Sequence, residues 1–322
     1  MSKVSPTINR NLKGIIKFDV VFENTTGLLI RMPTHAQVYR IGGADQYPMT
    51  TRKRYGDNIE LEVPLIPGSS LKGRMRSLLE TSMNLPQYTL DYKIWQHVRN
   101  PRGMSNEDLL KDIENRCIID ELFGWSAFNF EQLEKIVGEV KGIKDKEKLR
   151  EATMEYFEKL APTRLLVDDF TPTEECINKL NATSIADFLE EKMENRIDRI
   201  TSAADPRSIV RVKPGIEFGG CFKIMIYDID RDVIKNYLKI LANGLKLVEE
   251  TYLGGSGSRG YGRIRFRKIH VSVLKISNKE GKDFDLDKTK LKEELKEYSS
   301  VDELLDKIDE LAKEIENILF GE

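Results

Sequence analysis

The sequence predicts an α+β fold in which the core elements follow the order β-α-β-β-α-β. Residues 12–23 alternate apolar and polar side chains, which is typical of a strand with one buried face. Residues 70–83 and 231–250 repeat apolar residues at helical spacing. With 322 residues, of which 40% are hydrophobic and 32% charged, the chain can bury a large core as a soluble globular protein.

The first strand is followed by a long excursion and then by the first helix. Residues 24–66 read as hairpin-like, with a turn at Gly42 and Gly43 and an extended segment from Ile59 to Leu65. Pro67 and Gly68 end that segment, and Ser69 or Ser70 is expected to cap the helix over 70–83. The buried face of the helix is predicted to carry Leu71, Met75, Leu78 and Leu79.

Two insertions separate the first helix from the remaining core. Residues 84–160 are expected to be mostly helical, with a capped helix start at Ser105 and Asp108 and another helix over 144–160. A strand is predicted at 163–169. The second insertion covers 171–213, with a helix near 184–195 and a segment rich in arginine after it.

The second half of the core is predicted from three consecutive segments. They are a strand over 216–227, a helix over 231–250 and a strand over 262–275. Without the insertions the order corresponds to the split βαβ, or ferredoxin-like, arrangement. RNA-recognition motifs (RRMs) share this RRM-like core and bind RNA on the sheet, but their aromatic signature is missing from this sequence.

The C-terminal segment 277–322 differs in charge from the rest of the chain. It holds 8 Lys and 15 Asp or Glu, a net charge of −7; the whole chain carries −2, so residues 1–276 carry +5. Ser300 and Glu303 form a capping box before an amphipathic helical pattern. We therefore predict a core region over 1–276 and an acidic C-terminal helical extension over 277–322, which packs on its own domain or on a neighbouring subunit.

Composition excludes several function classes. We find no signal peptide pattern and no apolar run long enough to cross a membrane, so we expect a cytoplasmic protein without a membrane partner. The three cysteines Cys117, Cys176 and Cys221 are scattered, which argues against a disulfide framework. A zinc site from His97, Cys117 and Cys176 would lack a fourth ligand and a Cys-x-x-Cys pair, so zinc is not expected.

A glycine-rich basic loop is the most informative stretch. Five glycines fall within nine positions from Gly254 to Gly262, and residues 252–270 carry five Lys or Arg and no acid. Exposed amides and cations suit a phosphate-rich polymer. No Gly-Lys-Ser/Thr follows, so the loop is not a mononucleotide P-loop. The alternative is a flexible connection before a basic edge strand.

The start of the first helix carries a second basic group. Lys72, Arg74 and Arg76 follow one another at every second position, and no acid lies between Leu65 and Leu79, so ordinary intrahelical pairing is missing. The free amides and the positive end of the helix dipole also favour anions. We interpret the stretch as an anion site, although such bases also occur on solvated helix faces.

These two stretches resemble a known family. IPGSSLKGRMRSLLE and TYLGGSGSRGYGRIRF look like the RAMP superfamily of CRISPR-associated proteins, especially the backbone subunit of type III effector complexes, of the Csm type with the Cmr type as its cousin. Further matching pieces follow in the family's order: TGLLI at 26–30, IGGAD at 41–45, ELFG at 121–124, RLLVDDF at 164–170 and NRIDRITSAADPRSIVRVKPG at 195–215.

The resemblance implies a fold and an activity. It implies the ferredoxin-like core with a helical lid formed by the insertion 84–160 and a protruding thumb in the region 171–213. In the family the Ile-Gly-x-x-Asp loop holds the aspartate needed for cleavage of target RNA, and Asp45 matches it. One carboxylate can hold a divalent cation (Mg or Mn) or help to deprotonate a ribose 2′-OH. The alternative is an aspartate that caps its own turn.

The expected RNA contacts come from three places in the chain. The helix start contributes Ser69, Ser70, Lys72, Arg74 and Arg76; the glycine loop contributes Gly254, Gly255, Ser256, Gly257, Ser258, Arg259 and Arg263; the thumb contributes Arg199, Arg207 and Arg211. Asp168 and Asp169 are expected to be structural.

The expected partners follow from the same resemblance. They are a guide (CRISPR) RNA, a complementary target RNA, other copies of the chain in a filament and other type III effector subunits. The first functional hypothesis is a guide-binding backbone subunit that acts as an endoribonuclease in antiviral defence. Two alternatives stay open: a non-catalytic RNA-binding scaffold with the same fold, and an endoribonuclease that processes guide precursors.

Overall fold

The computed structural model describes residues 7–33, 46–56, 59–276 and 292–321. Its centre is a six-stranded sheet in the order β10-β9-β1-β8-β4, with β5 also paired to β8. All these pairs are antiparallel. The strands are β1 (Leu12–Asn24), β4 (Leu165–Val167), β5 (Thr171–Pro172), β8 (Glu217–Tyr227), β9 (Ile264–Lys275) and β10 (Lys292–Tyr298). The predicted mixture of helices with an antiparallel sheet is confirmed.

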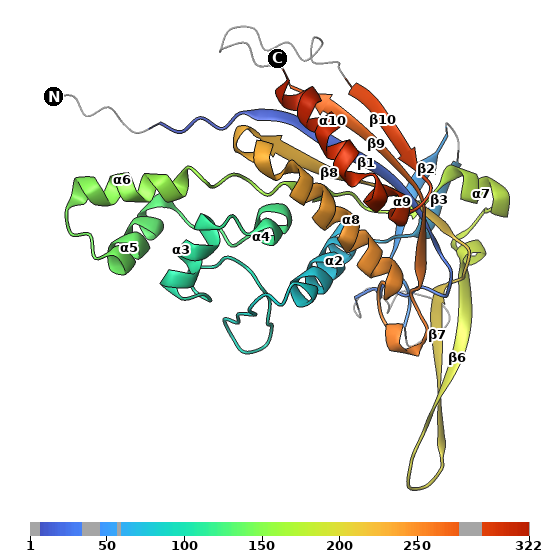
Figure 1. Ribbon diagram of the computed structural model, residues 1–322. Helices are drawn as coiled ribbons and strands as arrows, with labels where there is room; N and C mark the ends of the chain where they lie inside the picture. The colour runs from blue at the N-terminus through green and yellow to red at the C-terminus, as the bar shows by residue number, and fades with distance from the viewer. Residues whose placement is uncertain (1–6, 34–45, 57–58, 277–291, 322) are drawn as a thin grey trace.

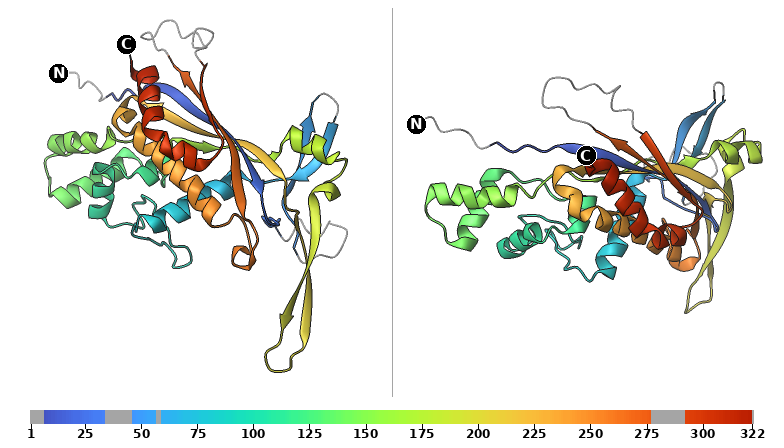
Figure 2. Two further views of the ribbon diagram at one scale, coloured as in Figure 1. Left: turned by 45° about the vertical axis from the view of Figure 1, so that its right-hand side comes forward. Right: turned by 45° about the horizontal axis from the view of Figure 1, so that its top comes forward.

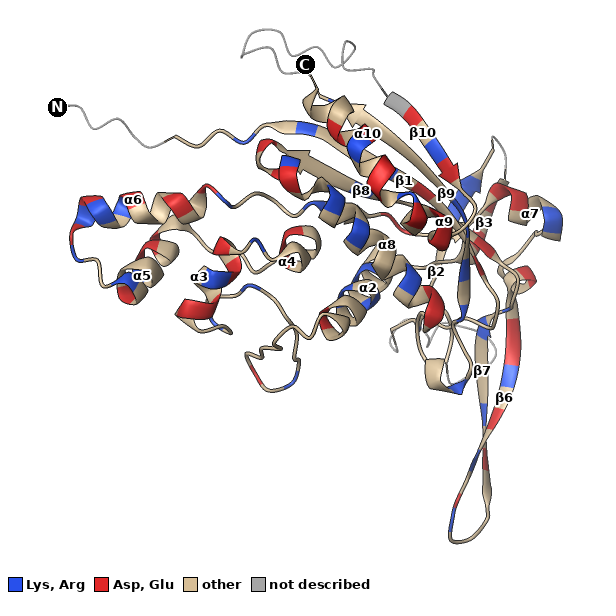
Figure 3. Cartoon of the chain, viewed as in Figure 1, with Lys and Arg blue, Asp and Glu red and all other residues tan. Residues whose placement is uncertain are grey.

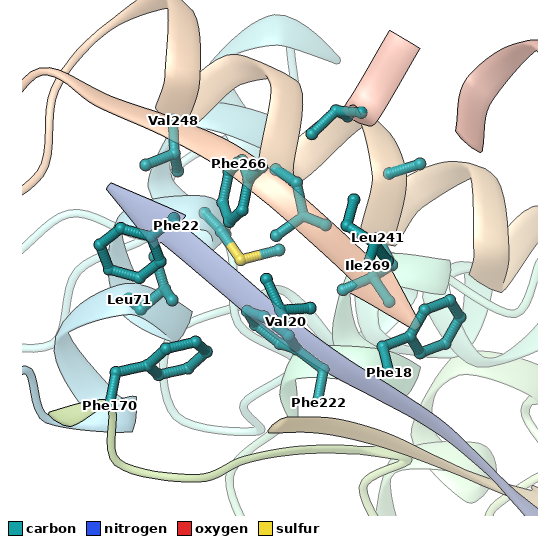
Figure 4. Packing of buried hydrophobic residues seen from close by; sticks show 14 of the residues in the cluster. Phe18, Val20, Phe22, Leu71, Phe170, Phe222, Leu241, Val248, Phe266 and Ile269 are labelled. Atoms are coloured by element: carbon teal, nitrogen blue, oxygen red, sulfur yellow. The ribbon is translucent and has the colours of Figure 1, made fainter. Parts of the chain in front are cut away.

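The long strand β1 lies at the centre because its alternating sequence suits one buried face. Its apolar residues Ile16, Phe18, Val20 and Phe22 are each at most 1% exposed. Antiparallel ladders join it to β8 on one side and to β9 on the other. Phe22 packs against Phe170, Phe218 and Phe266, whose ring centroids lie 5.4 to 5.7 Å from its own, and Figure 4 shows this part of the core.

Helices cover the apolar face of the sheet. They are α2 (Gly68–Ser82) and α8 (Ile234–Glu250), joined by α9 (Val301–Asp306) and α10 (Ile308–Phe320), and Figure 1 shows α8 and α10 lying along the strands. The helices α2 and α8 approach closely at Gly244, where an added Cβ would come within 2.8 Å of the Met75 side chain. The helix and strand predictions of both halves of the core are therefore confirmed.

The first insertion is helical, as predicted. It contains α3 (Asn106–Glu114), α4 (Ile118–Phe123), α5 (Phe130–Lys141) and α6 (Lys146–Phe157). The predicted cap is present, since Ser105 Oγ accepts a hydrogen bond of 3.1 Å from the Asp108 amide. A second apolar cluster, with Leu109, Ile113, Leu133 and Val137 among its members, holds α3 and α5 together. Figure 1 shows this helical region extending to one side of the sheet.

The second insertion contains one wrong prediction. Residues 184–195 are not a helix: α7 (Glu174–Leu180) precedes a single turn over Ile185–Phe188, and Leu189–Ile197 forms strand β6, which pairs with β7 (Ala204–Val212). The helix-forming residues of β6 are overridden because β7 offers the β-branched partners Ile209, Val210 and Val212 in a continuous ladder. Figure 2 shows the resulting hairpin projecting from the body.

The excursion after β1 also ends in a hairpin. Its strands are β2 (Thr50–Tyr55) and β3 (Ile59–Pro64), and β3 confirms the extended segment predicted at 59–65. The predicted turn at Gly42 and Gly43 lies outside the described residues. Among those that are described, no helix combines the length and the apolar run needed to span a lipid bilayer.

The C-terminal segment is not purely helical. The predicted amphipathic pattern forms α9 and α10, and Ser300 caps the first of them by accepting a hydrogen bond of 3.2 Å from the Glu303 amide. Strand β10 was not expected there, because its sequence KEELKEY is rich in helix-forming residues. It forms because the edge of β9 offers unpaired backbone groups, which β10 satisfies over Lys292–Tyr298.

Candidate nucleic-acid interface

An open pocket of about 680 Å³ runs along the β6–β7 hairpin, from the point where Gln46 and Ile209 join it to the body out to Arg196 and Asp205. We call it the root pocket. Three arginines from two distant segments line it, together with two acids and two amides: Arg196, Arg207, Arg259, Glu194, Asp205, Asn195 and Gln46. Figure 3 shows basic and acidic residues interspersed along the hairpin. The net positive lining of the pocket suits a phosphate backbone.

The segment after β1 joins the glycine loop to the hairpin. Leu28 exchanges backbone hydrogen bonds of 3.0 and 2.9 Å with Val212 of β7. The carbonyl oxygen of Leu29 accepts a hydrogen bond of 2.8 Å from the Gly255 amide. The Gly262 amide donates to the carbonyl oxygen of Gly27 at 2.9 Å. Three stretches that are far apart in sequence therefore meet at residues 27–29.

Glycine is required at two positions of the loop. Gly254 and Gly262 have φ of +80° and +72°, in the left-handed region that side chains disfavour. An added Cβ would lie 2.5 Å from the Leu29 carbonyl oxygen at Gly254, and 2.0 Å from the Leu253 carbonyl oxygen at Gly262. Much of the glycine pattern thus reflects tight packing of the loop on its own chain. The backbone amide of Gly255 is used there too.

Tyr261 anchors the loop against the hairpin. Its ring is fully buried, with the Arg211 guanidinium 4.5 Å and the Lys192 ammonium 4.6 Å from the ring centroid. Its hydroxyl donates to the Glu194 carboxylate at 2.6 Å. Burial and this carboxylate raise the pKa of Tyr261 to about 12, and the hydrogen bond lowers the pKa of Glu194. Neither residue was predicted to belong to the site, because nothing in the sequence marks them as neighbours.

The other predicted loop residues differ in their surroundings. Arg259 and Ser258 are exposed, and the Arg259 guanidinium donates to Ser256 Oγ at 2.6 Å. Arg263 is exposed as well but donates to the backbone oxygen of Thr251. Gly257 is buried against the Tyr252 ring. Only Arg259 of this group lines the root pocket.

The three predicted thumb arginines are not equivalent. Arg199 lies exposed in the connection between β6 and β7. Arg207 lines the root pocket and lies 3.4 Å from Asp205. The Arg211 side chain is only 15% exposed and is paired with Glu190 at 2.7 Å, so it holds the hairpin to Tyr261 instead of facing solvent.

The helix start differs from its predicted form. Helix α2 begins at Gly68, with Pro67 as the cap residue and no capping hydrogen bond from Ser69 or Ser70. The Gly68 amide donates to the Asp169 carboxylate at 2.8 Å, so this chain supplies an anion of its own at the helix N-terminus. Ser69 is exposed and Ser70 partly buried. Asp168 forms an ion pair of 2.7 Å with Lys223.

Arg76 contradicts the expectation that intrahelical pairing is missing. It forms an i,i+4 ion pair of 2.6 Å with Glu80 and another of 2.6 Å with Asp120 of α4, and its side chain is 16% exposed. It also donates to the carbonyl oxygens of His97 and Gly124 at 2.5 and 2.7 Å. The pair was missed because Glu80 lies one residue beyond the acid-free window and Asp120 comes from a distant segment.

Lys72 and Arg74 are half-buried residues of α2. Lys72 Nζ donates to the Leu165 carbonyl oxygen at 2.7 Å, and burial, followed by the Arg76 charge, lowers its pKa. Arg74 stacks on the Tyr252 ring at 4.1 Å and donates to the Tyr252 carbonyl oxygen at 3.1 Å. Arg74 therefore joins α2 to the start of the glycine loop.

Asp45 lies outside the described residues, but its neighbour Gln46 is placed. The Gln46 carbonyl oxygen accepts a hydrogen bond of 3.0 Å from the Val210 amide of β7, and Gln46 lines the root pocket. Sequence reasoning did not identify Gln46, which carries no motif of its own.

One group of potential metal ligands lies in the helical region. His97, Asp112, Cys117 and Asp120 have ligand atoms within 4.8 Å of one another. His97 Nε2 is 3.4 Å from Cys117 Sγ, so two of the three residues weighed for zinc do meet, whereas Cys176 is buried in the main core.

Ion pairs already engage the ligand atoms of this group. Arg99 contacts Asp112 at 2.5 Å, and Arg76 contacts Asp120. Burial alone would lower the pKa of His97, but its hydrogen bonds, led by the one with Asp112, raise it to about 10. Among the described residues no comparable group of ligands occurs at the root pocket.

Comparison with known proteins shows which family this chain resembles. The model of the RAMP superfamily matches residues 56–265. The CRISPR system Cms endoribonuclease Csm3 of Methanothermobacter thermautotrophicus is 33% identical over 221 residues, 65% of this chain and 69% of that protein. The Csm3 endoribonuclease of Methanocaldococcus jannaschii is 30% identical over 307 residues, 94% and 96% of the two chains. The crystal structure of Methanopyrus kandleri Csm3 is similar with a TM-score of 0.49, 20% identity, and coverage of 94% and 98%.

Proposed function

We propose a function for this chain on the basis of its family: it belongs to the RAMP superfamily and to its Csm3 family. The chain is proposed to be the guide-RNA-binding backbone subunit of a type III CRISPR interference complex. In this proposal it cleaves complementary target RNA at regular intervals. The observation that carries it is the full-length similarity to a Csm3 endoribonuclease. The cationic root pocket beside Gln46 supports it.

Within this proposal the named parts of the family fold are assigned as follows. The ferredoxin-like core consists of β1, α2, β4, β8, α8 and β9; the lid is the helical region α3–α6; the thumb is the β6–β7 hairpin. The division into a core region over 1–276 and an extension over 277–322 is part of the same proposal. Other copies of the chain and further effector subunits are the proposed protein partners.

The RNA path is proposed to run along α2 and through the root pocket. Lys72, Arg207 and Arg259 are the cations that we assign to phosphates, since their surroundings leave them half-buried or exposed. Base pairing between guide and target supplies sequence specificity, while the protein binds backbone and shape. Arg76 and Arg211 are assigned to internal ion pairs instead.

Cleavage is proposed to use the substrate's own 2′-hydroxyl group. Asp45 accepts the proton of that hydroxyl, the 2′-oxygen forms a bond to the adjacent phosphorus, and the bond from phosphorus to the 5′-oxygen breaks. The departing 5′-oxygen takes a proton from water, so the products are a 2′,3′-cyclic phosphate and a 5′-hydroxyl. Alternatively, Asp45 would hold a divalent cation (Mg or Mn), which would supply Lewis-acid stabilisation of the charge on the phosphate.

The decisive experiment compares two aspartate variants in the assembled complex. Asp45→Ala should abolish target cleavage while the Kd values for guide and target stay unchanged, because it removes a group of the chemical step only. Asp168→Ala, which removes a half-exposed carboxylate paired with Lys223, should cleave like wild type. Normal cleavage by Asp45→Ala would show that Asp45 is not the catalytic group and would favour the scaffold alternative.

A modified target tests the proposed attacking group. A target with 2′-deoxy residues at the cut positions should bind normally and resist cleavage, and chelation of divalent cations should stop the cleavage of ordinary RNA. Cleavage of the deoxy target at the normal rate would require activated water as the nucleophile.

A guide-processing role is the weaker second candidate. It would need a catalytic histidine, and the two described histidines are engaged elsewhere: His97 in the helical region and His270 with Glu294 on β10.

A further inference from the structure

The two strands of the hairpin are attached to the body in different ways. Strand β7 is held by backbone hydrogen bonds, through Val212 to Leu28 and through Val210 to Gln46. Strand β6 contacts the glycine loop through side chains: Glu194 reaches the Tyr261 hydroxyl, and Lys192 covers the Tyr261 ring. A rotation of the hairpin about β7 would break the contacts of β6 first.

Tyr261 is a fixed anchor for these contacts. Its neighbours Gly260 and Gly262 both adopt left-handed backbone angles, with φ of +82° and +72°, so the loop enters and leaves Tyr261 in tight turns. The ring is buried in one cluster with Leu29 and Ile209. With Arg211 and Lys192 over the ring, the hydroxyl has a defined position toward β6.

Glu194 connects this anchor to the root pocket. One carboxylate oxygen accepts from Tyr261 at 2.6 Å, and the other lies 3.9 Å from Arg259 Nε. Glu194 pairs across the ladder with Arg207, and all three of Glu194, Arg207 and Arg259 line the root pocket. A shift of Glu194 would therefore change the relative position of the hairpin and of a pocket arginine.

We propose that Glu194 is a positioning residue that acts through the Tyr261 hydroxyl. Its hydrogen bond sets the orientation of the β6–β7 hairpin relative to the glycine loop, and so aligns RNA in the root pocket for cleavage. The effect on RNA cleavage rests on the proposed function. The effect on the orientation of the hairpin does not, because it concerns the RNA-free protein alone.

The test uses variants that separate the hydrogen bond from the charge. Tyr261→Phe removes only the hydroxyl, Glu194→Ala removes the acceptor, and Glu194→Gln keeps an acceptor oxygen without the charge. Glu191→Ala is the matched control, because Glu191 is exposed on the same strand and contacts Ser208 of the hairpin itself. The variants are compared as full-length chains, alone and in the assembled complex.

Tyr261→Phe and Glu194→Ala should each lower the single-turnover cleavage rate about tenfold, with target Kd within about twofold of wild type, because misalignment affects the chemical step. Glu194→Gln should cleave at a rate within about threefold of wild type. The double variant Tyr261→Phe with Glu194→Ala should lower the cleavage rate no further than either single variant does. Equal loss in Glu194→Gln and Glu194→Ala with normal cleavage by Tyr261→Phe would overturn the inference in favour of a simple charge effect on Arg259.

Hydrogen exchange of the RNA-free chain gives a readout that does not need activity. Backbone amides of β6 should exchange faster in Tyr261→Phe and Glu194→Ala than in wild type, Glu194→Gln or the control. Unchanged exchange in both variants would overturn the inference. Because this measurement is independent of cleavage, it also decides the matter if the wild-type complex proves to be a scaffold.

Discussion

At the scale of single residues, the basic side chains of α2 divide into two kinds. Arg76 connects α2 to α4 and to the backbone of residues 97 and 124, and it is largely buried. Lys72 donates a hydrogen bond to the Leu165 carbonyl oxygen. Lys72 and Arg76 carry the same charge on the same helix but have different roles, and substitution of each residue can distinguish them.

Arg76→Ala should lower the free energy of unfolding by about 3–5 kcal/mol, because it leaves the carboxylates of Glu80 and Asp120 buried without their cation. Denaturant titration measures this, with the exposed Arg102→Ala as a control that should stay within about 0.5 kcal/mol of wild type. An unchanged midpoint for Arg76→Ala would show that the ion pairs contribute nothing to stability.

Lys72→Ala should instead act mainly on RNA. We expect a loss of about 1 kcal/mol in stability from the lost hydrogen bond, and a decrease of about one in the slope of log K for guide binding against log salt. Filter binding at several salt concentrations measures the slope. If the slope stays at the wild-type value, the phosphate contact must be assigned to another cation.

The Glu194–Tyr261 link should be insensitive to pH over a wide window. The folded pKa of Glu194 is lowered from 4.5, so its contribution is present above that pH and lost as the pH falls below it. The folded pKa of Tyr261 is raised from 10.0 to about 12, so its contribution is complete below pH 10 and lost as the pH rises through 12. The stability difference between wild type and Tyr261→Phe should stay constant from about pH 5 to about pH 9. A decline within that window would contradict these shifts.

At the scale of elements, two glycines of the RNA-facing segments serve different purposes. Gly262 closes the loop in a conformation where a Cβ would collide with the Leu253 carbonyl oxygen. Gly73 lies exposed on α2, and a Cβ there would have no neighbour within 4 Å. Within the described part of the chain, no contact requires glycine at position 73.

Gly73→Ala should therefore stabilise the chain by about 0.5–1 kcal/mol, since alanine favours the helix. If RNA passes as close to α2 as we propose, the same substitution should weaken guide binding. Gly262→Ala is the contrasting variant and should destabilise the chain by more than about 1 kcal/mol. Thermal unfolding and guide-binding titrations of both variants provide the comparison, and stronger guide binding by Gly73→Ala would exclude a close approach of the backbone.

At the scale of the whole molecule, the C-terminal segment is part of the main core. Tyr298, Val301, Leu311 and Ile315 are at most 2% exposed and belong to the same apolar cluster as the central sheet. Its outer face is acidic, and ion pairs such as Lys246–Asp302 join it to α8. The acidic charge that distinguishes the segment in sequence thus says little about how it packs.

Truncation after Ile276 should for this reason abolish cooperative folding or lower the Tm by more than about 10 °C, because it exposes the edge of β9 and the apolar side of α8. Ile315→Ala is a smaller perturbation of the same segment and should lower the free energy of unfolding by about 2–5 kcal/mol. Differential scanning calorimetry measures both. A truncated chain with the wild-type Tm would show that 277–322 is a separate unit.

The sequence predicted the core elements because their patterns are local. The alternation in β1 and the helical spacing in α2 and α8 need no knowledge of distant residues. Strands β6 and β10 were not predicted, because pairing with β7 and β9 outweighs their helix-forming composition. The site shows the same division: the basic residues were found from their spacing, whereas Glu194, Tyr261 and Gln46 meet only through tertiary contacts.

The length of the β6–β7 hairpin determines how far its tip moves when the hairpin rotates. Nine residues of extended chain at about 3.3 Å each make an arm of about 30 Å, so a rotation of about 10° at the root would move the tip by about 5 Å. That displacement exceeds the roughly 3.4 Å between successive nucleotides along one strand. Glu194 lies five residues along β6 from Leu189, so the same rotation would move its carboxylate by about 3 Å and break its hydrogen bond with the Tyr261 hydroxyl. The position of the hairpin tip along a bound strand would then depend on whether one tyrosine hydroxyl keeps its carboxylate partner.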